Sequence, residues 1–380
     1  MMLKLWGLFL AAAAAAVAPA LAVAAPAPEP PPAYGPPHGA DFTIKDFRFR
    51  SGETLPSLRI HYTTLGTPHR NAAGQIDNAV LVLHGTGGAG TSLLNKVFAG
   101  ELFGPGQLLD DSRYFIILPD GIGHGKSSKP SDGLRMRFPH YDYADMVEAQ
   151  HALVTQGLGI SRLRLIMGTS MGCMQAFMWG ETWPDAVAAM QPMACLPVRI
   201  VGRNRLWRRM IIDAIESDPA WDAGDYRDEP LAGLRTAADI QIIAGSAPQQ
   251  MQTALAAPEA VDRFLQEDMD AYLHGRLPNG GRMTPLDADD LIYQVDSSRD
   301  YDPSADLEAI TAQVMWINSA DDFINPPELG IAEKEAPRLK HGQFVLLPIG
   351  PNTHGHGTHT YAVAWKDRLE QLLKASEPTP

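Results

Sequence analysis

The chain has 380 residues, of which 45% are hydrophobic and 20% are charged, as is ordinary for a globular protein. This length is enough for one large domain with an inserted subdomain, or for two domains. The formal net charge is −13 and the sequence contains no long basic run, so we expect no nucleic acid among its partners.

The first 24 residues have the pattern of a secretory signal peptide. Lys4 gives them a positive start, residues 5–17 form an apolar run too short to span a bilayer with ease, and Ala22-Val-Ala24 fits the small-x-small cleavage rule. We therefore predict a signal peptide over 1–24 and an exported protein, periplasmic or secreted, with no membrane contact after processing. An N-terminal membrane anchor is the alternative. Residues 25–40 are rich in Pro and Ala, which is typical of an extended linker.

The next part of the chain reads as strands. Residues 41–50 and 58–65 carry alternating apolar positions and predict a hairpin. The apolar run 79–85 suits a strand buried on both faces of a parallel sheet, and 114–120 predicts another. The glycine-rich stretch 121–128 lacks the earlier glycine of a phosphate-binding loop, so no nucleotide cofactor is expected.

A short apolar strand over 163–167 then runs into Gly168-Thr-Ser-Met-Gly172, which fits G-x-S-x-G, and helix-compatible residues follow. A strand that feeds a helix through such a turn has the geometry of a nucleophile elbow, which holds its serine in a strained conformation above the sheet. The sequence therefore predicts Ser170 as a catalytic nucleophile.

From residue 200 to 301 the strand pattern disappears and helical segments replace it, and strands return at 313–320 and 342–349. Strands that alternate with helices predict a mostly parallel α/β sheet flanked by helices. We therefore expect a core over 41–199 and 302–376, and a helical lid over 200–301.

A serine nucleophile needs a base and an acid that orients the base, in the chain order Ser, Asp or Glu, His. Asp321 and Asp322 directly follow the predicted strand 313–320, and either could be the acid while the other serves in a turn.

Three histidines follow the last predicted strand and compete as the base: His354, His356 and His359. His356 is favoured, because the glycines on both sides of it permit a tight loop. The spacing H-x-H-x-x-H also suits a metal site, but a fourth ligand is not obvious, so no metal is predicted.

Two backbone N–H groups should stabilise the oxyanion of the reaction. One belongs to Met171, the residue after the nucleophile, and the other to the loop after residue 85, with Thr86 as the expected donor. His84 precedes Ser170 in the chain, and we expect it to brace this loop.

The chain has two cysteines, Cys173 and Cys195. An exported protein could pair them. Free Cys is among the most buried residue types, however, and two buried free thiols are the expectation.

The motifs in order resemble those of the homoserine O-acetyltransferase family. Gly168–Phe177 is similar to the family's elbow, residues 212–226 to its first lid helix, Asp322-Phe-Ile-Asn-Pro-Pro327 to its acid motif, and Gly355-His356 to its base. The resemblance covers about residues 41–375. It implies the α/β-hydrolase fold, Asp322 as the acid, His356 as the base, and possible homodimers formed through the lid.

The chain departs from this family where Gly357 stands in place of an Asp after the base, and an exported protein has no supply of acetyl-CoA. We therefore predict a serine hydrolase that cleaves an ester or related acyl bond of a small molecule, without a cofactor, through an acyl-enzyme. An acyltransferase that moves the acyl group to an alcohol is the alternative.

Overall fold

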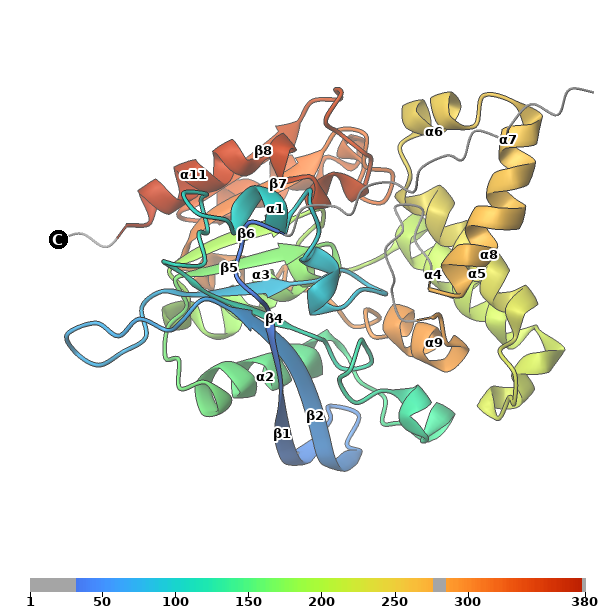
Figure 1. Cartoon of the computed structure of the whole chain (residues 1–380), viewed down its shortest axis with the longest axis horizontal. Coiled ribbons are helices and arrows are strands. Elements are labelled where there is room, and N and C mark those ends of the chain that lie inside the picture. The colour runs from blue at the N-terminus through green and yellow to red at the C-terminus, as the bar shows by residue number, and fades with distance from the viewer. Residues whose placement is uncertain (1–31, 276–284, 378–380) are drawn as a thin grey trace, which may run out of the picture. The chain divides into compact units, whose positions relative to one another are not determined.

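The computed structural model describes residues 32–275 and 285–377, which form an eight-stranded sheet flanked by helices (Figure 1). The strands lie in the order β1-β2-β4-β3-β5-β6-β7-β8. The first pairings, β1 with β2 and β2 with β4, are antiparallel, and all others are parallel. Their bounds are β1 His38–Arg48, β2 Thr54–Leu65, β3 Ala79–Leu83, β4 Phe115–Pro119, β5 Leu165–Thr169, β6 Ala189–Met193, β7 Gln313–Ser319 and β8 Gly342–Leu347.

The central strands are apolar on both faces because helices cover both. Leu81 and Leu83 of β3 join the apolar cluster that contains residues of α2 (Tyr143–Ala152) and α3 (Met171–Thr182). Val80 and Val82 point the other way, toward α1 (Ala99–Leu102) and α11 (Lys366–Ala375). This alternation within a wholly apolar run is what a doubly covered parallel strand requires. The predicted α/β architecture is confirmed.

A helical insertion lies between β6 and β7, in the region where the sequence predicts helices without strands (Figure 1). Its helices have an apolar cluster of their own, which includes Ile211, Ile215, Leu291 and Val295. They are α4 Gly202–Glu216, α5 Leu231–Gly245, α6 Pro248–Ala254, α7 Pro258–Arg263, α8 Met269–Leu273 and α9 Ala288–Asp296, and a short α10 (Ile331–Glu335) follows β7.

Helix α9 ties the insertion to loops of the core. Asp290 accepts from Lys129 Nζ at 2.9 Å and from the Ser131 N–H at 2.9 Å, while Gln294 Nε2 donates to the Gly123 carbonyl at 2.8 Å. Asp290 is only 6% exposed, and charge-assisted hydrogen bonds of this kind are the strong ones. The insertion is therefore held against the same edge of the sheet at which the parallel strands end.

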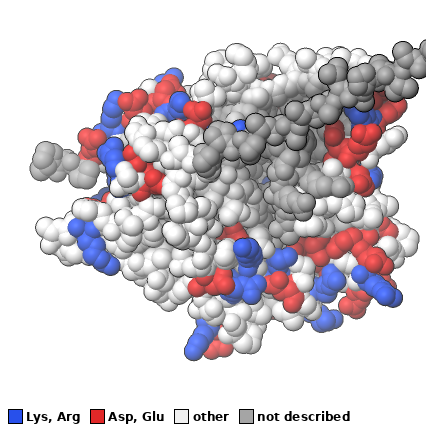
Figure 2. All heavy atoms as spheres, in the orientation of Figure 1, with Lys and Arg blue, Asp and Glu red and all other residues white. Residues whose placement is uncertain are grey.

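Charged side chains on the surface contribute less. On the face shown in Figure 2, Asp and Glu are interspersed with Lys and Arg. Pairs such as Arg59 with Asp132, 3.0 Å apart, are about two-fifths exposed on both sides. Exposed ion pairs of this type stabilise a fold by at most about 1 kcal/mol each, so the buried apolar clusters dominate.

The first part of the chain differs from its prediction at one boundary. The predicted signal peptide, residues 1–24, lies outside the described residues. The predicted linker is too long at its C-terminal end, because β1 begins at His38 and pairs residues 38–40 with β2 from Thr64 to Tyr62. Backbone pairing extends this strand beyond the apolar positions that suggested it.

None of the helices that the structure describes is long and apolar enough to cross a membrane.

The expectation of two free thiols is wrong, because Cys173 and Cys195 form a disulfide. Cys173 lies in the first turn of α3, and Cys195 follows β6, the strand next to the one that precedes α3. The crossover of α3 onto the sheet brings the two Cα atoms to 5.9 Å, a normal separation for a disulfide. Burial, the basis of the expectation, is correct for both side chains and does not distinguish a thiol from a disulfide.

Candidate active site

Ser170 stands at the sharp turn between β5 and α3, with a φ of 53° and a ψ of −109°. A non-glycine residue adopts this conformation only when its surroundings impose it. The flanking glycines allow the turn to close: a Cβ at Gly168 would lie 2.0 Å from the Gly172 carbonyl oxygen, and a Cβ at Gly172 would lie 2.3 Å from that of Leu83. The G-x-S-x-G pattern is therefore explained by backbone contact on both sides of Ser170.

Two loops from distant parts of the chain bring polar groups to Ser170. His356, from the loop after β8, accepts a hydrogen bond at Nε2 from Ser170 Oγ over 2.8 Å. Its Nδ1 donates to Oδ2 of Asp322, in the loop after β7, over 2.9 Å. The carboxyl ends of the parallel strands meet at this edge of the sheet, and the three side chains predicted from the sequence are brought together there.

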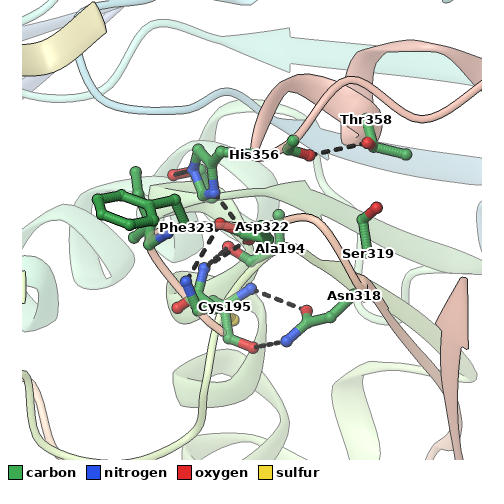
Figure 3. A network of polar contacts seen from close by, with 12 residues as sticks. Ala194, Cys195, Asn318, Ser319, Asp322, Phe323, His356 and Thr358 are labelled. Carbon is green, nitrogen blue, oxygen red and sulfur yellow. Dashed lines mark hydrogen bonds and ion pairs between the residues drawn. The ribbon is translucent and has the colours of Figure 1, made fainter. Parts of the chain in front are cut away.

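The surroundings of Asp322 favour its ionised form. The residue is 2% exposed and accepts from the N–H groups of Ile324 and Asn325, at 2.8 and 3.1 Å, and from Asn325 Nδ2 at 3.0 Å. Figure 3 shows this network below His356. Burial alone would raise the pKa of the Asp322 carboxyl, but the His356 imidazole and the Asn325 hydrogen bonds outweigh it and hold that pKa below its usual range.

The rival residues have other contacts. The Asp321 carboxylate accepts from the Gly355 N–H at 3.0 Å and from Ser319 Oγ, so it fastens the histidine loop. His354 stacks on Tyr361 and contacts Gln250 of α6 through Nδ1 at 2.7 Å. His359 lies edge-on to His356 with ring centroids 5.4 Å apart, and burial together with His356 lowers its pKa to about 3. His359 is therefore uncharged at neutral pH.

The expected oxyanion donors lie beside Ser170. Met171 is the first residue of α3, a position whose N–H has no partner within the helix. Thr86 lines the same cavity as Ser170, and the loop before it passes so close that a Cβ at Gly85 would lie 3.3 Å from Ser170 Cβ.

His84 braces this loop, as expected. Its Nδ1 donates to the Gly85 carbonyl at 2.8 Å, and its Nε2 accepts from the Gly121 N–H at 3.0 Å. Burial lowers the pKa of His84, which favours the neutral ring that this pair of contacts requires. Its main-chain oxygen accepts from the Gly172 N–H, so one residue connects the loop to the elbow.

Two adjoining cavities open onto the site. The first, of about 310 Å³, is lined by Ser170, His356 and Thr86. Residues of the insertion, among them Trp207, Gln241 and Tyr272, form its opposite wall. The second, of about 770 Å³, lies between the N-terminal ends of α4 and α6 and the loops after β7 and β8. Four residues line both cavities: Met174, Asn204, Ile324 and Asn325.

Sequence reasoning missed Asn325. It holds Asp322 with its side-chain amide and main-chain N–H, and the same amide donates to the Ala194 carbonyl at 3.0 Å. An Asn three residues after the acid and directly before Pro-Pro was a visible signal, because a buried carboxylate needs donors beyond one imidazole. In residues 32–275 and 285–377, no group of three or more His, Cys, Asp and Glu side chains is arranged to hold a metal ion.

Comparison with known proteins agrees with this architecture. Residues 78–348 match the family model described as the alpha/beta hydrolase fold. A homoserine O-acetyltransferase from Pelobacter propionicus is 32% identical over an alignment of 347 positions, which covers 83% of this chain and 90% of that protein. The acetyl esterase MekB superposes with a TM-score of 0.75 and 25% identity, over 90% of this chain and 97% of that one. An acetylester hydrolase from Corynebacterium glutamicum superposes with a TM-score of 0.74 and 22% identity, over 90% and 96%.

Proposed function

We propose that this chain, which belongs to the α/β-hydrolase fold family, is a serine hydrolase that cleaves an ester or related acyl bond through an acyl-enzyme. The observation that carries the proposal is the continuous hydrogen-bonded series from Ser170 through His356 to Asp322, with distances of 2.8 and 2.9 Å. A serine hydroxyl becomes a useful nucleophile when a base accepts its proton and an acid orients that base.

The proposed reaction follows from these contacts. Ser170 Oγ attacks the substrate carbonyl while His356 Nε2 takes its proton, and Asp322 stabilises the imidazolium that forms. The N–H groups of Thr86 and Met171 stabilise the oxyanion. His356 returns the proton to the leaving alcohol, and a water molecule, activated in the same way, then releases the acid and regenerates Ser170.

Acyl transfer is the second candidate, and the homoserine O-acetyltransferase at 32% identity favours it. The first half of the reaction is the same, and an alcohol replaces water in the second. The composition of the smaller cavity argues against homoserine itself as the acceptor. The described residues that line this cavity include no Asp or Glu to pair with an α-ammonium group, and the residue after His356 is Gly357.

The test of the proposed function compares Ser170→Ala with Ser57→Ala, a control at an exposed strand position. With p-nitrophenyl acetate we expect Ser170→Ala to lower kcat by roughly 10⁴- to 10⁶-fold with an unchanged circular dichroism spectrum, and Ser57→Ala to leave kcat unchanged. Equal turnover by wild type and Ser170→Ala would remove both candidates.

A second measurement separates the two candidates. The acyl ester is incubated with and without homoserine, glycerol or another alcohol, and the transferred ester and the free acid are quantified by mass spectrometry. Hydrolysis predicts free acid as the main product at every alcohol concentration. A transfer product that exceeds free acid would favour the acyltransferase.

We also propose that the protein is exported. The N-terminal residues have the signal-peptide pattern, and the disulfide between Cys173 and Cys195 is of a kind that persists in oxidising compartments. Intact-mass analysis of the protein recovered from its native host tests this: loss of about the first 24 residues supports export, and retention of Met1 with a reduced Cys pair contradicts it.

A further inference from the structure

We propose that the larger cavity binds an apolar chain of the substrate, so that the enzyme prefers esters that carry a medium or long hydrocarbon chain over acetyl esters of short alcohols. This inference rests on the proposed function and names its substrate class. It follows from three observations: the position of the cavity, the residues exposed on its walls, and the pairing of its polar atoms.

The cavity continues the one that contains Ser170. Met174 of α3, Asn204 of α4 and Ile324 and Asn325 after β7 line both, so a chain attached to a carbonyl at Ser170 can pass from one into the other. Its volume of about 770 Å³ compares with about 310 Å³ for the cavity at the nucleophile. A pocket of this size holds a ligand of drug-like dimensions, far more than an acetyl group needs.

Large apolar side chains are exposed on its walls. Val201 is 63% exposed, Leu329 56%, Ile349 51% and Phe323 38%, and all four line this one cavity. Val201 directly precedes α4, and Leu329 lies in the turn before α10. Ile349 lies in the loop after β8, and Phe323 in the loop after β7, beside Asp322 (Figure 3). A contiguous exposed apolar surface of this kind marks a binding site more often than chance, whereas single exposed apolar residues do not.

Polar side chains on the cavity wall, buried or partly buried, are already paired within the protein. Asn325 Nδ2 donates to Ala194 and Asp322, Asn204 Oδ1 accepts from Arg208, and Gln250 Nε2 donates to the Thr353 carbonyl at 2.6 Å. A polar ligand that entered would lose its water without gaining these groups as partners. An apolar chain has no hydrogen bonds with water to lose, so the cavity favours an apolar chain over a polar one.

Two arginines of the lining lie at the solvent edge. The Arg203 guanidinium lies over the Phe323 ring, 3.8 Å from its centroid, and covers that ring with a planar surface. Arg199 is 69% exposed and paired with Asp302 at 3.2 Å. Asp321 and Asp322 also line the cavity, but their carboxylates accept hydrogen bonds from Gly355 and from His356 and Asn325. The unpaired surface of the interior is therefore apolar, while the edge is exposed to solvent.

Either side of the ester bond could supply the chain, and two substrate series distinguish them. In p-nitrophenyl esters the acyl chain is lengthened from two to twelve carbons, and in alkyl acetates the alcohol is lengthened over the same range, with acid release followed by pH-stat below the micellar concentration. In one series kcat/KM should rise about fourfold for each methylene until the cavity is filled. A maximum at the shortest member of both series overturns the inference.

Two variants locate the effect in this cavity. Val201→Trp fills it and Leu329→Asp places a charge in it, and each should lower kcat/KM for the ten-carbon substrate at least about tenfold, with the acetyl ester within about twofold of wild type. The matched controls, Val363→Trp and Leu206→Asp, alter similarly exposed positions outside the linings of both cavities and should leave kcat/KM for both substrates unchanged.

The outcomes separate this inference from the proposed function. If wild type cleaves no ester at all, both the proposed function and this inference are wrong. Cleavage that depends on Ser170 but does not change with chain length, or that changes equally in variants and controls, removes only the inference. A variant that changes the molar mass by light scattering while the chain-length profile stays constant would assign the surface to a second copy of the chain, and would also overturn it.

Discussion

Removal of the disulfide should destabilise the protein by an amount that its loop length sets. The bridge joins residues 22 apart in sequence. In the chain-entropy model, the closure of such a loop lowers the entropy of the unfolded state enough to stabilise the fold by about 3.4 kcal/mol at 25 °C. A chain of 380 residues has an unfolding entropy of about 0.8 kcal/mol per kelvin near its midpoint, so the change in Tm is about 4 °C.

The perturbation is the double variant Cys173→Ala/Cys195→Ala. Both side chains are almost fully inaccessible, so Ala also leaves unfilled volume, and the measured loss should equal or exceed the entropic figure. Thermal unfolding by circular dichroism gives Tm, and urea titration gives the free energy of unfolding. The control is reduced wild type, in which the bridge is broken but both cysteine side chains keep their volume, so the loss should be close to the entropic part alone.

Two results would refute this reasoning. If iodoacetamide modifies both cysteines of unfolded wild type that was never reduced, the bridge does not form in solution. If the bridge forms but the variant loses less than about 1 kcal/mol, the loop-closure argument fails for this chain. In neither case is the assignment of Ser170 affected, because the flanking glycines, not the bridge, allow its conformation.

Three further predictions concern the site and its support. Asp322→Asn should lower kcat for p-nitrophenyl acetate about 10⁴-fold while Asp321→Asn lowers it less than about tenfold, and equal losses would contradict the assignment of the acid. Gly172→Ala should yield little soluble protein, because the added Cβ would lie 2.3 Å from a main-chain oxygen. The control Gly245→Ala, whose Cβ would have no atom within 4 Å, should keep or raise Tm. A soluble, active Gly172→Ala would contradict this reasoning. Burial, reinforced by neighbouring carboxylates, raises the pKa of Glu181 to about 8, so the folded state keeps a proton that the unfolded chain loses above about pH 4.5. Stability should therefore fall as pH rises from 4.5 to 8, and Glu181→Gln should raise Tm at pH 8.5 but not at pH 4; the same Tm difference at both values would refute the shift.

Local sequence patterns were sufficient to predict the main secondary-structure elements. The run of five apolar residues in β3, the turn at Ser170 and the helical stretch after β6 each follow from residues adjacent in sequence, because strand burial, turn geometry and helix periodicity are local properties. The choice among neighbouring candidates was harder. Asp321 and Asp322 have the same chemistry, and the resemblance favoured the residue that the structure brings to His356.

Residues adjacent in the chain thus encode the alternation of strands and helices, the elbow, and the residue types that follow β7 and β8. Packing between distant segments sets three other features: the pairing of Cys173 with Cys195, the support of Asp322 by Asn325, and the second cavity that adjoins the one at Ser170. Each of these features depends on where a loop or helix crosses the edge of the sheet. That position is set by the burial of apolar side chains elsewhere in the core. Distances between such segments are set by packing across the whole core, and no stretch of neighbouring residues encodes them.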